Sequence, residues 1–208
     1  MSSTSPLRRG DLAPTPLDQI ATWLAEGRAE GEDAAASMVL ATIDDSGSPA
    51  LRTVPLRAVS DLGLVLHTDL GSGKGHDLLA RPASVSALLV WRRQRRQVRV
   101  DAHAEVLPAD ASDAAFAQRD RQAQLRAWAA SDRRPIRDRA ELEAQVDEAM
   151  AAHAGDHPVA RPATWAAVVL VPRRVEVWQA ELGGPAHDRF LYERPPRGST
   201  WEARRLRP

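Results

Sequence analysis

Cysteine is absent from this chain of 208 residues. Its absence excludes disulfide bonds, thiolate metal sites and a cysteine nucleophile, and it is typical of proteins that work in a reducing cytoplasm. No apolar run approaches the length of a membrane span, and the segment over residues 1–14 lacks the apolar stretch of a signal peptide. We therefore expect a cytoplasmic protein that has no membrane partner.

The chain also has no net charge, because Lys+Arg and Asp+Glu both number 28. The chain therefore has no overall field that would attract nucleic acid. The stretch "WRRQRRQVRV" over residues 91–100 is rich in arginine, but aromatic residues make up only 4% of the chain and do not alternate with these arginines. We interpret the stretch as a solvated barrel rim and predict no nucleic-acid partner; binding to RNA or DNA is the weaker alternative.

Lysine is almost absent, and the only one, Lys74, lies in the glycine-rich stretch "HTDLGSGKGH" over residues 67–76. Glycines allow the backbone to approach a ligand closely, hydroxyls donate hydrogen bonds, and the start of a following helix favours an anion. The stretch lacks the serine or threonine that follows the lysine in a Walker loop. It therefore predicts a phosphate-binding turn of another type, with a flexible surface turn as the alternative.

Short segments rich in apolar and β-branched residues predict most of the remaining chain as strands. Strands are expected over residues 38–43, 51–57, 62–68, 84–91, 96–107, 164–171 and 173–179, with a last hairpin in the C-terminal tail. Few of these strands are spaced for parallel crossovers. The pattern therefore predicts a mainly antiparallel β-barrel with helices packed outside it.

Capping residues mark the expected helices. Thr15 begins one helix, and a helical block over residues 111–153 includes an Asp138–Glu141 capping pair. We expect a flexible N-terminal arm over residues 1–14 and a single domain over residues 15–208, with the helical block as an insert in that domain.

Other features outside the glycine-rich stretch also suggest chemistry. Pro55 interrupts the strand "LRTVPLR" and cannot donate to a ladder, so it demands a sheet edge or a bulge. Arg52 and Arg57 lie on either side of it; they face opposite ways on a regular strand unless a bulge realigns them, and arginine is a common partner of phosphate. His187 precedes an aspartate in "HDRFLY", which suits acid–base work. His153 and His157 have a possible metal-ligand spacing, but no cluster of further ligands accompanies them, so we predict no metal site.

Several stretches, taken in order along the chain, resemble the pyridoxamine 5′-phosphate oxidase family. "PLDQIATWL" is similar to the first helix of the family, and "LRTVPLR" is similar to its R-x-V-x-L-K strand. "HTDLGSGKGH" resembles the segment Y-T-x-x-x-S-R-K, and "RRQVRV" resembles R-Q-V-x-V. "VEVWQ", "HDRFLYER" and the terminal W-x-x-x-R-L-x-P resemble the C-terminal signature. The resemblance covers residues 16–208, and the shared order is stronger evidence than any single stretch.

The resemblance implies an FMN-binding split barrel of antiparallel Greek-key type with peripheral helices, which works as a homodimer with flavin at the subunit interface. It implies an FMN site formed by Arg52, Thr53, Val54, Leu56, Arg57, His67, Thr68, Ser72, Lys74, Gln97, Trp178 and Arg189. The substrate would contact Arg57, Arg119 and His187. Of these, the resemblance implies catalytic roles for Arg57 and His187.

The chain departs from the family at expected flavin contacts. Gly73 takes the place of an arginine that would lie beside Lys74 at the FMN phosphate, and His67 replaces a tyrosine. A glutamine–serine pair expected at the flavin aligns near Asp132 and Arg133. These changes predict weaker, but not abolished, FMN binding.

The set of side chains expected to bind a substrate phosphate is reduced further. The family uses a lysine, a tyrosine, an arginine and a serine, which align here with Arg57, Ala115, Arg119 and Ala123. An arginine expected over the substrate ring becomes Pro185. Each lost charge-assisted hydrogen bond costs about 1.5–3 kcal/mol of binding free energy, so a different substrate is an open alternative.

Together these residues imply an FMN-dependent oxidase that oxidises pyridoxamine or pyridoxine 5′-phosphate, or a related small molecule, with O2 as electron acceptor. One alternative is an oxidase that acts on another reduced aromatic substrate, as the phenazine-biosynthesis oxidases of the family do. A second alternative is a non-catalytic split barrel that binds flavin or haem. The sequence leaves the substrate and the physiological electron acceptor open.

Overall fold

The structure is a computed structural model of the chain, and it describes residues 6–32, 36–79, 84–129, 135–155, 157–180, 187–195 and 200–207. Its helices are the short η1 (Arg9–Asp11) and α1 (Pro16–Ala29), α2 (Gly73–Leu79), α3 (Ala109–Ala117), α4 (Arg121–Ala129) and α5 (Arg139–Ala152). Its strands are β1 (Ser37–Ile43), β2 (Pro49–Pro55), β3 (Ala58–Val59), β4 (Leu64–Asp69), β5 (Ser84–Trp91), β6 (Arg96–Val106), β7 (Trp165–Gln179), β8 (Asp188–Glu193) and β9 (Glu202–Arg205).

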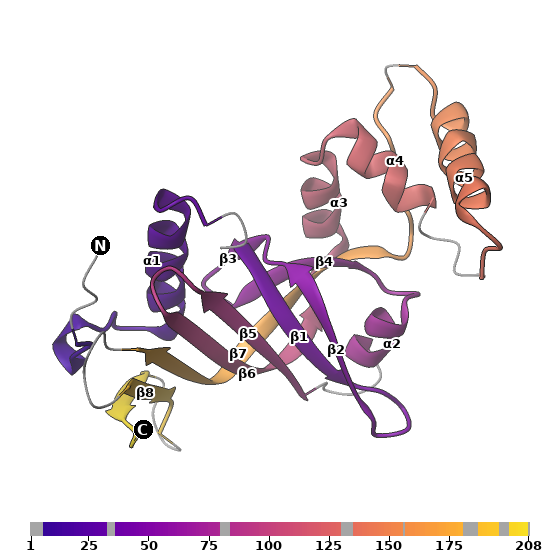
Figure 1. The fold of residues 1–208 in the computed structure, drawn as a ribbon. Helices are drawn as coiled ribbons and strands as arrows, with labels where there is room; N and C mark the ends of the chain where they lie inside the picture. Colours follow the sequence, from indigo (N-terminus) through magenta and orange to yellow (C-terminus); the bar gives the residue numbers. More distant parts are fainter. Residues whose placement is uncertain are drawn as a thin grey trace.

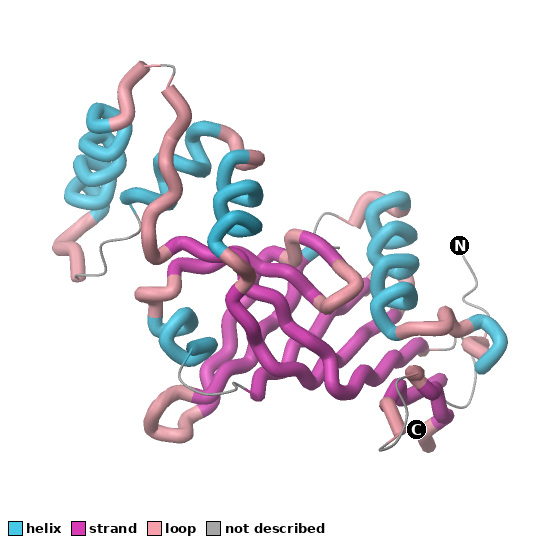
Figure 2. The backbone as a smooth tube through the Cα atoms, turned by 180° about the vertical axis from the view of Figure 1, so that it is seen from behind, coloured by secondary structure: helices cyan, strands magenta, loops and turns pink. Residues whose placement is uncertain are grey.

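The strands form one curved antiparallel sheet in the order β2-β1-β5-β6-β7-β4-β3, with β8 beside β7 and β9 beside β8. The helices lie outside this sheet (Figures 1 and 2). The alternation along β6 shows how the barrel forms, because Val98, Val100 and Ala102 are each 0% exposed and face the core. The predicted split barrel with peripheral helices is confirmed.

The strands predicted over residues 164–171 and 173–179 are a single strand, β7, so the prediction of two strands is wrong. Pro172 has no N–H to give to the ladder, but the register with β6 shifts between Asp101 and Ala102, and this irregularity lets the strand continue. The first half of β7 pairs with β4, and its second half pairs with β8. β7 therefore connects the two ends of the barrel.

Helix α1 packs on the barrel through an apolar face. Its Ile20 and Trp23 are 0% and 2% exposed, and the Trp23 ring meets the ring of Trp91 on β5 edge-on, with centroids 6.1 Å apart. Thr15 caps the helix as predicted, since its hydroxyl accepts a hydrogen bond from the N–H of Asp18 at 3.2 Å.

Helices α3, α4 and α5 form a layer of their own beyond the start of β7 (Figure 1). They correspond to the helical block predicted over residues 111–153, and Asp138 caps α5 by accepting from the N–H of Glu141 at 3.0 Å. A second, smaller core joins this block to the barrel and contains Phe116, Leu125, Val159 and Trp165. Trp165, the first residue of β7, is therefore the point where block and barrel meet.

Leu7, in the described part of the N-terminal arm, is packed against the barrel. Leu7 is 6% exposed, its N–H donates to a carboxylate oxygen of Asp188 at 2.7 Å, and its carbonyl accepts from Arg205 at 2.7 Å. Arg205 also pairs with Asp188. Because these groups satisfy one another at a buried position, the expectation of a loose arm does not hold for Leu7.

Candidate functional site

A cavity of about 490 Å³ lies where the loop after β2, strand β4 and the helical block meet. It is lined by Arg57, His67, Ala115, Gln118, Arg119, Asp120, Ala123 and Arg126. We call it the arginine pocket. The fold thus brings Arg57, His67 and Arg119 together. The pocket also contains all four positions that align with the family's ligands for the substrate phosphate, namely Arg57, Ala115, Arg119 and Ala123.

Separate local contacts hold these side chains at the arginine pocket. The N–H of Arg57 donates to the carbonyl of Val65 at 2.8 Å, which ties the loop after β2 to β4. The ring of His67, on β4, lies 4.7 Å from the ring of Trp165 between centroids. Arg119 lies between α3 and α4, and its guanidinium carbon is 5.4 Å from the centroid of the same tryptophan. Trp165 therefore supports both His67 and Arg119.

The arginine pocket is positively charged, because its three arginines face a single carboxylate, that of Asp120. Burial, followed by repulsion from Arg57 and Arg119, lowers the pKa of His67 to about 4. Burial and repulsion from Arg57 also lower the pKa of Arg119. Nδ1 of His67 and Nε of Arg119 are buried with no hydrogen-bond partner among the described residues. Like charges held together around unsatisfied polar atoms are typical of a functional site, here one suited to an anion.

The glycine-rich stretch forms a tight turn between β4 and α2. Oγ of Ser72 donates to the carbonyl of Asp69 at 2.6 Å and accepts from the N–H of Gly75 at 2.8 Å. The hydroxyl of Thr68, a residue that is 4% exposed, donates to the same carbonyl at 3.3 Å. These two hydroxyls therefore shape the turn, and Lys74 follows in the first turn of α2.

Gly75 is required by the close packing of this turn. A Cβ at Gly75 would lie 2.4 Å from the carbonyl oxygen of Asp69 and 2.5 Å from backbone atoms of Leu70, whereas nothing lies within 4 Å of a Cβ at Gly73. Gly75→Ala should lower the free energy of unfolding by about 1–3 kcal/mol, while Gly73→Ala should be neutral or stabilise by up to about 1 kcal/mol. Urea unfolding measures both variants, and equal effects would contradict the packing argument.

Arg52 contacts α2 and does not line the arginine pocket. Its guanidinium donates to Oγ1 of Thr42 at 2.5 Å and pairs with the carboxylate of Asp77 at 3.4 Å. Thr42 donates to the same carboxylate at 2.5 Å. Lys74 and Asp77 are three residues apart and share a face of α2. Arg52 therefore pairs with an acidic residue that shares a face of α2 with Lys74 and that the sequence analysis did not include.

Strand β2 is an edge strand, and Pro55 is its last residue. The register with β1 runs without a shift to the pair Ser37 and Pro55, so the predicted edge, and not a bulge, accommodates the proline. Val54 and Leu56 are 5% and 3% exposed and belong to the core, whereas Thr53 is exposed. Any contact of Val54 or Leu56 with a flavin must therefore be made by backbone atoms.

Gln97, Trp178 and Arg189 lie side by side at neighbouring register positions of β6, β7 and β8. The ring of His187 is 4.8 Å from the ring of Trp178 between centroids. The buried carboxylate of Glu176 holds Arg189 through contacts of 3.0 and 3.1 Å. Four predicted residues, Gln97, Trp178, His187 and Arg189, thus form one group, which we call the β8 cluster.

The arginine pocket and the β8 cluster lie at opposite ends of β7. Trp165, which contacts His67 and Arg119, is the first residue of this strand, and Trp178 is its next-to-last. Trp178 lies thirteen positions after Trp165, which corresponds to roughly 40 Å of extended chain, and Figure 1 shows β8 and α3 at opposite ends of the molecule. One chain therefore contains two parts of the predicted site without bringing them together.

The sequence analysis missed three residues that line the arginine pocket, namely Gln118, Asp120 and Arg126. A signal for Arg126 was present, because Ala123 and Arg126 are three residues apart and share a face of α4. Asp132, Arg133 and Pro185, for which departures from the family were predicted, lie outside the described residues.

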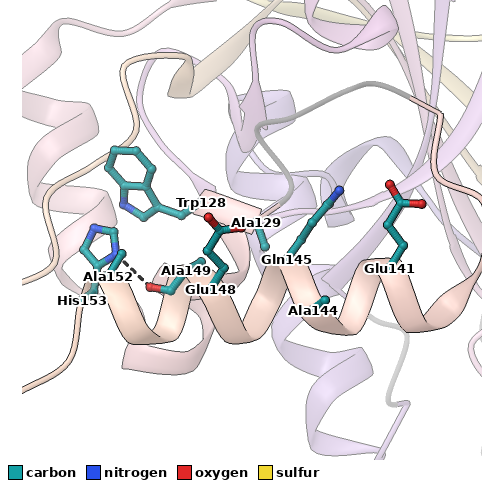
Figure 3. Close-up of a pocket in the computed structure, with 9 residues that line it drawn as sticks. All are labelled: Trp128, Ala129, Glu141, Ala144, Gln145, Glu148, Ala149, Ala152 and His153. Atoms are coloured by element: carbon teal, nitrogen blue, oxygen red, sulfur yellow. Dashed lines mark hydrogen bonds between the residues drawn. The ribbon is translucent and has the colours of Figure 1, made fainter.

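Two further cavities formed by the described residues contain none of the predicted site residues. One, of about 500 Å³, lies between α4 and α5, and Figure 3 shows Glu141, Gln145 and Glu148 along α5 with Trp128 and His153 at its other end. The other, of about 560 Å³, lies beside β9. Within the described ranges, no three histidine or acidic side chains are placed to share a metal ion. No described helix combines the length and the apolar character needed to cross a membrane.

The sequence model of the family described as pyridoxamine 5′-phosphate oxidase matches residues 22–153. The chain belongs to this family. A pyridoxine/pyridoxamine 5′-phosphate oxidase of Nocardioides sp. is 38% identical over 202 residues, which cover 97% of this chain and 92% of the relative. One of Gluconobacter oxydans is 34% identical over 198 residues, which cover 95% and 96%. The family predicted from the order of motifs is therefore confirmed.

Two solved structures superpose on the chain. PhzG from Burkholderia lata, in complex with tetrahydrophenazine-1-carboxylic acid, matches with a TM-score of 0.87 and 25% identity over 100% of both chains. An FMN-binding protein from Nostoc punctiforme that is related to pyridoxamine 5′-phosphate oxidase matches with a TM-score of 0.73 and 21% identity, over 95% of this chain and 100% of the other. The likeness to PhzG agrees with the predicted likeness to phenazine-biosynthesis oxidases.

Proposed function

We propose that this member of the pyridoxamine 5′-phosphate oxidase family is an FMN-dependent oxidase of a small anionic substrate, with O2 as the electron acceptor. The arginine pocket carries the proposal, because Arg57, His67 and Arg119 line one cationic cavity at one end of the barrel. Bound FMN would supply the redox chemistry by accepting two electrons from the substrate and passing them to O2. The protein would bind the substrate, orient it and exclude water.

The residues around α2 fit the phosphate of FMN. Arg52 and Lys74 provide two positive charges against the single negative charge of Asp77. A dianionic phosphate is stabilised by such cations through charge-assisted hydrogen bonds. Because Gly75 has no Cβ, the backbone segments of this turn pack closely together. The space at Gly73 is open, so there is room beside the turn. We therefore propose that Arg52 and Lys74 bind the phosphate, with the turn that contains Thr68 and Ser72 as its support.

For the substrate we propose pyridoxamine or pyridoxine 5′-phosphate or a related anion, bound through Arg57 and Arg119. A second candidate is a reduced aromatic carboxylic acid. It is favoured by the alanines at positions 115 and 123, which give the pocket no hydroxyl donor for a phosphate. It is also favoured by the match to PhzG, whose complex contains a carboxylic acid of this kind.

We further propose a homodimer in which the arginine pocket of one subunit meets the β8 cluster of the other. The proposal is supported by the position of these two groups at opposite ends of β7. A two-fold axis would bring each pocket to the partner's cluster and form two equal sites. In such a site Gln97, Trp178 and Arg189 would close over the flavin, and His187 would lie within reach of a proton on the substrate.

Variants at the turn test the FMN assignment. Lys74→Ala should weaken FMN binding roughly 10- to 100-fold, because it removes a charge-assisted bond worth about 1.5–3 kcal/mol. Gly73→Arg should strengthen binding, because the added guanidinium enters open space. Arg139→Ala is the control, since that side chain is 85% exposed on α5. Quenching of flavin fluorescence measures the Kd values.

Two results would count against this assignment. Equal weakening by Lys74→Ala and Arg139→Ala would contradict the phosphate-binding turn, and an absence of quenching with the unaltered protein would contradict FMN binding itself. Turnover then separates the substrates. Peroxide and pyridoxal 5′-phosphate from pyridoxamine 5′-phosphate support the first candidate, and peroxide from tetrahydrophenazine-1-carboxylic acid alone supports the second. A yellow protein that oxidises neither would favour the non-catalytic alternative.

A further inference from the structure

The arginine pocket has an unusual set of donors for an anion. Its described lining includes no serine, threonine or tyrosine, and two alanines, Ala115 and Ala123, occupy its wall. Arg126 and His67 lie in the same cavity. An anion in this pocket is therefore bound through positive charge and not through neutral hydroxyls.

His67 faces charged groups on one side and uncharged groups on the other. On β7, its neighbour in register is Ala167, and the ring of Trp165 lies 4.7 Å from its own ring. Its charged neighbours in the pocket are Arg57 from the loop after β2, Arg119 and Asp120 from the segment between α3 and α4, and Arg126 from α4. The charge on His67 is therefore governed by the cations of the pocket and by whatever they bind.

An anion bound between the arginines offsets their positive potential at His67. Without it, burial and the arginines oppose a charge on the imidazole and lower its pKa to about 4. When the anion is bound, protonation of the imidazole by solvent becomes favourable. Nδ1 of His67 and Nε of Arg119, which have no hydrogen-bond partner among the described residues, are then next to a strong acceptor.

We propose that His67 binds the anionic group of the substrate as an imidazolium, taking up one proton with each anion that enters the arginine pocket. In this step one N–H bond forms with a proton from solvent, and no electron moves. The inference rests on the proposed function and adds to it that the substrate carries a carboxylate or phosphate recognised together with a proton. His67 is then a specificity residue, and anion binding strengthens as the pH falls.

Proton uptake on binding tests the proposal directly. The FMN-saturated protein is titrated calorimetrically at pH 6 with sulfate, which represents a phosphate group, and with benzoate, which represents a carboxylate. Each titration is repeated in two buffers of different ionisation enthalpy. We expect uptake approaching one proton per pocket with at least one probe, and a Kd that falls by up to about tenfold per pH unit between pH 8 and 5.5. The probe that shows uptake identifies the anion chemistry.

Variants assign the proton to His67 and the anion to this pocket. His67→Phe should bind the probe without proton uptake and with a flat pH dependence, Arg119→Met should lose binding, and Arg139→Ala, a change at an exposed position of α5, should retain both binding and uptake. The proposal is overturned if neither probe binds, if the unaltered protein binds without uptake, or if His67→Phe takes up the same proton. If His67→Phe does not fold, His67→Gln replaces it. Heat and protons are measured without turnover, so a failed oxidase assay does not affect this result.

Thermal unfolding gives a second readout. As the pH falls from 6.5 toward 4, the unfolded chain protonates His67 before the folded protein does, so Tm should fall more for the unaltered protein than for His67→Phe. Saturating probe should reduce this difference, because it raises the pKa of His67 in the folded state. A probe that leaves the difference unchanged would contradict the proposal.

Discussion

Arg119→Met should lower kcat/KM by about 100-fold or more while leaving the free energy of unfolding within about 1 kcal/mol of its original value. Loss of two charge-assisted bonds at about 1.5 kcal/mol each corresponds to a rate effect of this size. Stability is spared because Arg57 and Arg126 repel Arg119 and help to lower its pKa. Methionine can also keep the contact with Trp165, whose ring centroid now lies 5.4 Å from the guanidinium.

The matched control for this prediction is Arg139→Met, which removes an exposed arginine of α5 that pairs with Glu143. It should change neither kcat/KM nor the urea midpoint. Steady-state kinetics and urea unfolding are measured on both variants. A large loss of stability in Arg119→Met with little loss of kcat/KM would show that Arg119 supports the fold and does not bind substrate.

Mixing two inactive variants should restore about a quarter of the original activity. Arg119→Met damages the arginine pocket, and Arg189→Gln damages the β8 cluster. If each site combines the pocket of one subunit with the cluster of the other, a mixed dimer has one site with both changes and one with neither. With free exchange, about half of the dimers are mixed, and about a quarter of all sites are intact.

A mixture of Arg119→Met with Arg57→Met is the control, because both changes lie in the same pocket. Every site in that mixture is damaged, so activity should stay low. Subunit exchange is followed by native mass spectrometry with one variant labelled. Full exchange without recovery of activity in the Arg119→Met and Arg189→Gln mixture would show that the two parts do not meet across a dimer.

Local features of the structure were predictable from short stretches of sequence. The caps at Thr15 and Asp138 form hydrogen bonds to residues three positions on, and the alternation along β6 places Val98 in the core. Pro55 predicted a sheet edge or a bulge because a proline has no N–H to donate to a ladder, and it lies on the edge strand β2. Such features depend on neighbours close in the chain, which the sequence lists directly.

Other features depend on which distant segments pack together. The register shift opposite Pro172 keeps β7 in one piece, although the residues alone indicated two strands. Asp77 meets Arg52 only because α2 folds back onto β1 and β2. Arg126 enters the arginine pocket only because α4 packs near β4 and the loop after β2. The contacts of Pro172 and Asp77 have no signature at a fixed spacing in the chain. The spacing of Ala123 and Arg126 indicates a shared face of α4 but not the segments that this face meets.

By itself, the sequence determined the family, the mainly antiparallel barrel and the identity of the charged and aromatic side chains, because these follow from residue order and short-range periodicity. Only the tertiary structure decided how those side chains are grouped. It placed Arg57, His67 and Arg119 in one pocket, and it put Trp178 at the other end of the same strand. The physical reason is that burial and electrostatic fields depend on distances in space, and strand pairing sets these distances.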